Sequence, residues 1–142
     1  MPLGNPSRVA RWSVWIIGLA AAACAAQPVT EASLAGKHWV AGMPEVEDAK
    51  QRPRLEFMRD GRLVGYTGCN VLAGKWRIES NDVRLDGLAS TKRGCLGPAG
   101  EVEKRFLAAV TPSSRISLEG ATLVVQGPGG ERMAFAESPS NP

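Results

Sequence analysis

Apolar and polar positions alternate along several short segments of the chain. In AGKWRIE, for example, Trp76 and Ile78 alternate with Lys75 and Arg77. A period of two predicts strands of an antiparallel sheet that has one face toward the core and one face in water. The same kind of pattern predicts strands at 38–41, 54–58, 62–68, 73–79, 83–90, 115–120, 122–126 and 132–136.

The breaks between these segments carry turn signals. Short runs rich in Gly, Asp and Asn predict hairpin turns, and they lie at 59–61, 80–82, 119–120 and 127–131. A longer break, MPEVEDAKQRPR at 43–54, is charged and carries two prolines. We therefore expect a surface loop over about residues 42–53.

The period changes at 99–110, where apolar residues recur every four positions, at Val102, Phe106 and Val110. This pattern predicts one amphipathic helix. Glu101 and Glu103 lie near its start, where the helix dipole favours acids, and Pro112 follows its end. A helix with a single apolar stripe must lie against the sheet, so the sequence predicts an α+β domain.

The N-terminal stretch has a different character. Arg8 and Arg11 precede the uncharged run WSVWIIGLAAAA at 12–23, which is short for a membrane span of about 20 residues. A positive start, a short apolar run and small residues after it predict a secretory signal peptide over 1–23. The alternative is a permanent N-terminal anchor helix.

Cys24 follows this run in the stretch LAAAACAAQP, which resembles the lipobox of bacterial lipoproteins. The resemblance implies lipid attachment at Cys24, and Ala25 after it implies the outer membrane, with the domain facing the periplasm. The alternative is cleavage at the ACA site, which gives a soluble periplasmic protein. We expect a tether at 24–33, a domain at 34–136 and a frayed tail at 137–142.

The charge balance depends on this processing. Loss of Arg8 and Arg11 from the 17 basic residues leaves 15 against 14 acidic ones, a net charge of about +1. No segment combines a basic stripe with interleaved aromatic residues, so nothing in the sequence indicates a nucleic-acid partner. The two cysteines that remain after Cys24, Cys69 and Cys95, form an even pair in an exported chain, which favours a disulfide over two separate buried thiols.

Several of these segments together resemble the META/HslJ family of small bacterial envelope proteins. The resemblance rests on Trp39 and on the runs LEF…DGRLVGYTGCN, LAGKW, LASTKRGC, EVEKRFLAAV, RISLEGATLVV and RMAF. It departs from the family at Arg93 and Gly94, where methionine and alanine are common. The resemblance implies a strongly curved, half-barrel-like antiparallel sheet packed around one main helix, and an association with heat shock or stress.

Candidate catalytic chemistry is sparse. His38 is the single histidine, so a Ser-His-Asp or Cys-His arrangement would have to use it. With Cys69 and Cys95 as a pair, the ligand set is too thin for a structural zinc site, and we expect no metal and no cofactor. The glycine-rich run at 127–131 lacks the lysine and serine of a phosphate loop.

The remaining candidate site is a turn and its surroundings. Asn70 suits a turn beside Cys69, and the run Thr91, Lys92, Arg93 precedes Cys95 and is basic. We expect a monomeric, non-enzymatic envelope lipoprotein that binds an envelope protein or an apolar ligand and serves stress tolerance or maintenance. The alternatives are an inhibitor of a lytic enzyme or protease, using the 42–53 loop, and a thiol redox protein that uses the two cysteines.

Overall fold

The computed structural model describes Met1 and residues 27–139. Its eight strands form one antiparallel sheet in the order β5-β4-β3-β2-β1-β8-β7-β6. Their bounds are β1 Lys37–Ala41, β2 Arg54–Phe57, β3 Arg62–Tyr66, β4 Val71–Glu79, β5 Asp82–Ser90, β6 Arg115–Glu119, β7 Thr122–Gln126 and β8 Arg132–Ser138. The helices are α1 Glu31–Leu34, the 3-10 turn η1 Ala49–Gln51, and α2 Pro98–Ala109.

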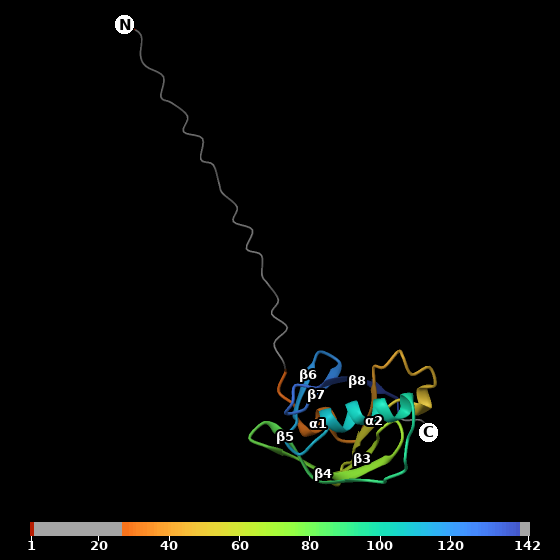
Figure 1. Cartoon of the computed structure of the whole chain (residues 1–142). Coiled ribbons are helices and arrows are strands. Elements are labelled where there is room, and N and C mark those ends of the chain that lie inside the picture. The colour runs from red at the N-terminus through yellow and green to blue at the C-terminus, as the bar shows by residue number, and fades with distance from the viewer. Residues whose placement is uncertain (2–26, 140–142) are drawn as a thin grey trace.

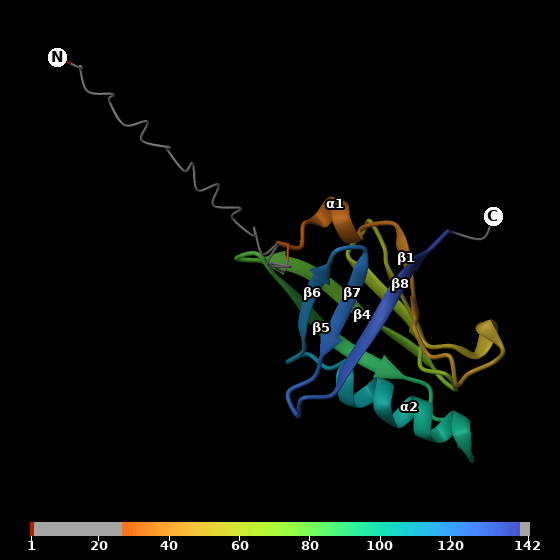
Figure 2. The same ribbon diagram turned by 90° about the horizontal axis from the view of Figure 1, so that it is seen from above.

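The sheet is built from two sequential runs of strands that meet at β1 and β8. Strands β1 to β5 follow one another, β6 to β8 form a second meander, and the β1–β8 pairing joins them. The sheet curls so that β5 and β6, its two edges, come near each other (Figures 1 and 2). The chain passes between these edges through α2. The predicted half-barrel around one main helix is confirmed.

The core lies between the concave face of the sheet and α2. Val102, Phe106 and Ala109 are the buried residues of α2, as the four-residue spacing predicts for the first two. Phe106 meets Phe135 of β8 edge to face, with ring centroids 6.4 Å apart. The helix begins at Pro98, whose missing N–H costs nothing at this position. These side chains pack in the space between the sheet and α2.

Residues 27–33, which the sequence assigns to a tether, lie on the domain instead. The amide of Gln27 donates a hydrogen bond to Leu118 O of the edge strand β6, at 3.1 Å. Val29 and Leu34 are buried in the core, and Thr30 caps α1 with its side chain. Most residues of this segment are small or polar, which suggested a tether. Burial of its few apolar side chains stabilises the packed arrangement instead. The predicted Cys24 and residues 2–23 of the signal peptide lie outside the described residues.

The far end of the chain also differs from the prediction. Glu137 and Ser138, assigned to a frayed tail, belong to β8 and pair with Trp39 and His38 of β1. The pairing with β1 gives these two residues backbone hydrogen bonds. Their polar side chains gave no pattern from which a strand could be predicted. Among the described residues, no helix has the length and apolar character needed to cross a membrane.

Candidate functional site

The turn between β3 and β4, residues 67–70, forms the centre of the candidate site. Thr67 is fully buried, and its Oγ1 accepts hydrogen bonds from the amides of Cys69 (3.3 Å) and Asn70 (2.8 Å). Gly68 has a φ of +97°, and a Cβ at this position would lie 2.6 Å from Val102 Cγ1 of α2. Glycine is therefore required here by backbone conformation and by space.

Cys69 and Cys95 lie together as a disulfide pair in the structure, with their Cα atoms 6.3 Å apart. This separation lies in the usual range for a disulfide. The bond links the 67–70 turn to the segment 91–97, which connects β5 to α2. Cys69 is buried, with 5% of its surface exposed, and Cys95 is half-buried, so Cys95 is the more accessible of the two.

Asn70 makes a second, non-covalent link between the same two segments. Its Nδ2 donates to Arg93 O at 3.1 Å, and its Oδ1 accepts from Thr91 Oγ1 at 2.9 Å and from the Arg93 amide at 2.8 Å. Only 2% of its surface is exposed. The guanidinium of Arg93 in turn donates to Cys69 O. The turn and the segment 91–97 are thus held together by a buried amide as well as by the disulfide.

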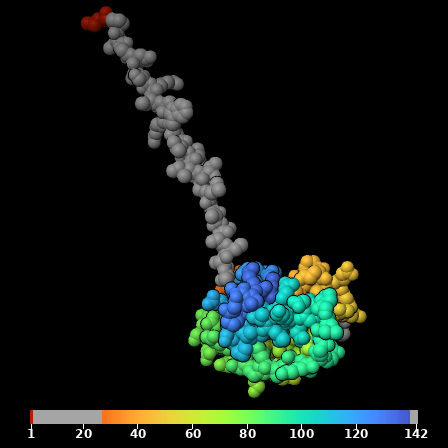
Figure 3. All heavy atoms as spheres, viewed as in Figure 1, coloured from red at the N-terminus to blue at the C-terminus, as the bar shows by residue number. Residues whose placement is uncertain are grey.

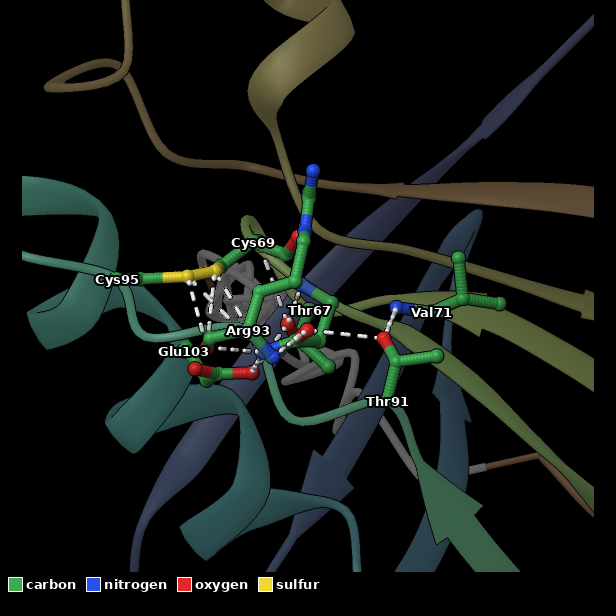
Figure 4. The surroundings of a disulfide bond; sticks show 8 residues. Thr67, Cys69, Val71, Thr91, Arg93, Cys95 and Glu103 are labelled. Atoms are coloured by element: carbon green, nitrogen blue, oxygen red, sulfur yellow. Dashed lines mark hydrogen bonds between the residues drawn. A yellow bond between two sulfur atoms is a disulfide. The ribbon is translucent and has the colours of Figure 1, made fainter.

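Glu103 brings α2 into this cluster (Figure 4). Its Oε1 accepts hydrogen bonds from Thr67 Oγ1 at 2.9 Å and from Asn70 Nδ2 at 2.8 Å. The sequence assigned Glu103 only a role at the helix start. It is half-buried and faces the disulfide, where one ligand atom from each of Glu103, Cys69 and Cys95 lies within 4.8 Å of the others. Helical periodicity predicts on which side of α2 Glu103 lies. It does not predict that this side of the helix meets the two cysteines.

The structure therefore unites three of the four predicted turn and surface residues, namely Asn70, Thr91 and Arg93. Lys92 is exposed, and its side chain makes no hydrogen bond or ion pair within the described part of the chain. The remaining candidate, His38, lies on β1 with its Nδ1 3.5 Å from Glu56 Oε2 of β2. It stands apart from the cysteines, so the described residues bring no histidine to this site.

A hollow of about 320 Å³ lies beside this cluster, between the 42–53 loop and the start of α2. Val46, Gly68, Pro98, Ala99 and Val102 supply its apolar lining, and its acidic rim is formed by Glu45, Glu47 and Asp48. In the space-filling view, the gold surface of the loop adjoins the teal surface around the start of α2 (Figure 3). This combination of an apolar lining and an acidic rim suits a ligand in which an apolar group lies next to a positive charge.

The 42–53 loop that forms one wall of the hollow is anchored along its length. Met43 is buried in the core, and Arg52 Nε donates to Val46 O at 2.9 Å. Arg105 of α2 donates to Glu45 Oε1 at 2.8 Å. A backbone hydrogen bond and this Arg105 contact hold the pKa of Glu45 below its usual value, which favours its charged form beside Arg105.

Comparisons with known proteins agree with this fold. One solved structure, an NMR structure of a protein from Burkholderia xenovorans, is 18% identical and has a TM-score of 0.59, with 94% of this chain and 99% of that chain covered. A second NMR structure is 20% identical with a TM-score of 0.62, and 76% and 94% of the two chains are covered. At these identities the likeness concerns the fold alone.

No curated protein matches the chain. The model of the META domain family matches residues 32–140. This range spans both meanders, α2 and the Cys69–Cys95 cluster, so the match covers the sheet, the helix and the candidate site together. The resemblance predicted from the sequence is confirmed, and the chain belongs to the META domain family.

Proposed function

We propose that this chain is a non-enzymatic binding lipoprotein of the bacterial envelope, and that it binds a protein partner in the hollow beside α2. The proposal extends to a role in envelope stress tolerance or maintenance. The observation that carries it is the hollow itself, which combines an apolar lining with an acidic rim. The partner it fits presents an apolar side chain flanked by a lysine or arginine.

The walls of the hollow are well braced, which favours binding. Gly68 belongs to the turn that the disulfide and Asn70 fix, and Pro98, Ala99 and Val102 belong to α2. A preformed site loses little conformational entropy when a partner binds. Leu96, one residue after Cys95, is 92% exposed, and it offers the partner an aliphatic contact near the hollow.

The position of the hollow suits a protein anchored through its N-terminus. The segment that leads into α1 enters at one end of the domain, whereas the start of α2 and the 42–53 loop lie at the other end (Figures 1 and 2). An anchor at Cys24 would lie only three residues before Gln27, which pairs with β6. The lipid would therefore hold one end of the domain at the membrane and leave the hollow directed into the periplasm.

We favour this binding function over the inhibitor alternative. It requires a loop that projects into the cleft of another enzyme, and the 42–53 loop was the candidate. Met43 and Pro53, at its two ends, are buried, and Glu45 is paired with Arg105 of α2. The loop forms one wall of a hollow, a shape that receives a side chain.

The anchor is tested by the intact mass of the protein extracted from bacterial membranes. We expect a chain that begins at Cys24 and carries acyl groups, because Cys24 follows the lipobox-like run. A chain cleaved within ACA and recovered from the soluble periplasmic fraction would refute the lipid anchor, while the binding site would still stand to be tested separately.

The binding site is tested with a photoreactive residue in place of Leu96, in cells that export the full chain. We expect one discrete cross-linked species, and we expect Ala99→Trp, which fills the hollow, to lower its yield by about tenfold or more, since burial of one aliphatic side chain contributes about 1.5–3 kcal/mol. The matched control is Ala121→Trp, an exposed position in the β6–β7 turn. Equal yields from the Ala99→Trp and Ala121→Trp chains would contradict the proposal.

A further inference from the structure

The disulfide, its neighbouring carboxylate and Asn70 form an arrangement that binding of a protein does not require. The two cysteine sulfur atoms and one carboxylate oxygen of Glu103 lie within 4.8 Å of one another. The three residues come from three separate elements, namely the β3–β4 turn, the segment 91–97 and α2. The sequence analysis found too few ligands for a metal because it could not place Glu103 beside the cysteines.

We propose that reduction of the Cys69–Cys95 bond turns this cluster into a binding site for a thiophilic divalent cation of the zinc class. The ligands are the two thiolates and the Glu103 carboxylate, and the fourth position is open to solvent beside half-buried Cys95. Three protein ligands with one open position are a recognised zinc arrangement. The site is independent of the protein-binding hollow and does not rest on it.

The chemical steps balance with one named reductant. A dithiol transfers two electrons and two protons to the Cys69–Cys95 bond and becomes a disulfide itself. Each cysteine then carries a thiol. The cation binds as both thiols lose their protons to solvent, since the thiolate is the form that binds metal. The Glu103 carboxylate supplies the third ligand atom.

Glu103 is already oriented for this role. Both of its hydrogen bonds, from Thr67 and Asn70, fall on Oε1, and within the described residues no hydrogen bond falls on Oε2. One carboxylate oxygen is thus fixed by neutral donors while the other is left for a cation. Outer partners that orient a ligand in this way are a common feature of metal sites.

The Asn70 side chain also lies beside both sulfur atoms. Its Nδ2 is 3.5 Å from Cys69 Sγ and 3.9 Å from Cys95 Sγ, while its shorter hydrogen bonds go to Arg93 O and Glu103 Oε1. After reduction the two sulfur atoms must move to about 3.8 Å apart, the separation that zinc–sulfur bonds of about 2.3 Å impose in a tetrahedron. Cys95 lies in a segment without helix or strand, and rotation of its side chain provides this movement. Asn70 keeps the hydroxyl of Thr91 and the backbone of Arg93 in place meanwhile.

The ligand set selects the class of cation. Two thiolates favour Zn²⁺ and its spectroscopic substitute Cd²⁺ over Mg²⁺ and Ca²⁺, which prefer sites made of oxygen ligands alone. The test uses the full chain with Cys24→Ser in every sample, so that only Cys69 and Cys95 carry thiols. The protein is reduced with a phosphine under anaerobic conditions and titrated with Cd²⁺. The ultraviolet charge-transfer band from thiolate to metal is recorded, and Zn²⁺ affinity is measured against a chromophoric chelator.

We expect the reduced chain to bind one equivalent of Cd²⁺ and the oxidised chain to show no such band. Glu103→Gln should weaken Zn²⁺ binding by about tenfold or more. The matched control is Glu101→Gln, two residues earlier on the same helix and exposed, which should leave the affinity unchanged. Absence of the band in the reduced chain, or equal affinities for Glu103→Gln and Glu101→Gln, would overturn the proposal.

Folding is followed in the same samples by circular dichroism. If the reduced chain loses structure, one equivalent of Zn²⁺ should restore the spectrum of the oxidised chain, because binding of the cation to the folded state stabilises that state. Failure of Zn²⁺ to restore it would count against the site as firmly as absence of the charge-transfer band.

Discussion

Replacement of both Cys69 and Cys95 by serine should lower the free energy of unfolding by about 3–4 kcal/mol. The bond closes a span of 26 positions, and without it the unfolded chain gains the conformational freedom of that loop. Net stabilities of small domains are about 5–15 kcal/mol, so this loss is a large share of the total. The domain should remain folded at room temperature and unfold at a clearly lower denaturant concentration.

Urea unfolding followed by tryptophan fluorescence measures this effect, with a chelator present so that no bound cation contributes. The unmodified chain under reducing conditions should unfold at nearly the same urea concentration as the double serine variant. Cys24→Ser is the matched control and should leave the midpoint unchanged. A double variant as stable as the control would mean that the two cysteines are not bonded in the folded protein.

Most strands could be predicted well because they have one buried and one exposed face. The exception is β7, in which Leu123, Val124 and Val125 are all buried. In β4, by contrast, Trp76 is buried and Lys75 and Arg77 are exposed, so the alternation in the sequence reflects the structure directly. The same reasoning placed α2 within one residue at each end. Local periodicity is enough wherever an element packs against the core on one side only.

The errors came from segments whose structure depends on distant partners. Val29 is buried because β6 and the core lie beside it, and Glu137 is in a strand because β1 offers an edge. Neither neighbour can be inferred from the few residues around each position. Only strand order determines both, and the pairing of the first strand with the last, across almost the whole chain, was not available from the sequence.

The candidate site shows the same division. The turn residue Asn70 and the segment Thr91–Arg93 were identified from composition and from the nearby cysteines, and the structure brings them together. Glu103 was missed because helical periodicity says which face a residue occupies but not what the face meets. The hollow was missed for a related reason, since its walls come from a loop and a helix about 50 residues apart in sequence.

Asn70→Ala should cost about 2–4 kcal/mol of stability, comparable to loss of the disulfide. Its side chain satisfies Arg93 O, the Arg93 amide, Thr91 Oγ1 and Glu103 Oε1. A buried polar group that loses its partner costs about 1–3 kcal/mol, and the partly exposed partners here regain some hydrogen bonds from water. Thr91→Ala removes the hydrogen bond to Asn70 Oδ1 and the one that Thr91 Oγ1 accepts from the Val71 amide, and it should cost about 1–2 kcal/mol. Lys92→Ala should stay within about 0.5 kcal/mol.

The same urea measurement in the double serine background separates the two braces. The disulfide and Asn70 both hold the segment 91–97 against the 67–70 turn. When one of them is removed, the other still holds the segment in place and reduces the loss of stability. The loss from Asn70→Ala should therefore be greater without the disulfide than with it, by about 0.5 kcal/mol or more. Strictly additive losses would mean that the amide and the sulfur atoms act on separate parts of the fold, and that the hollow beside them has one brace instead of two.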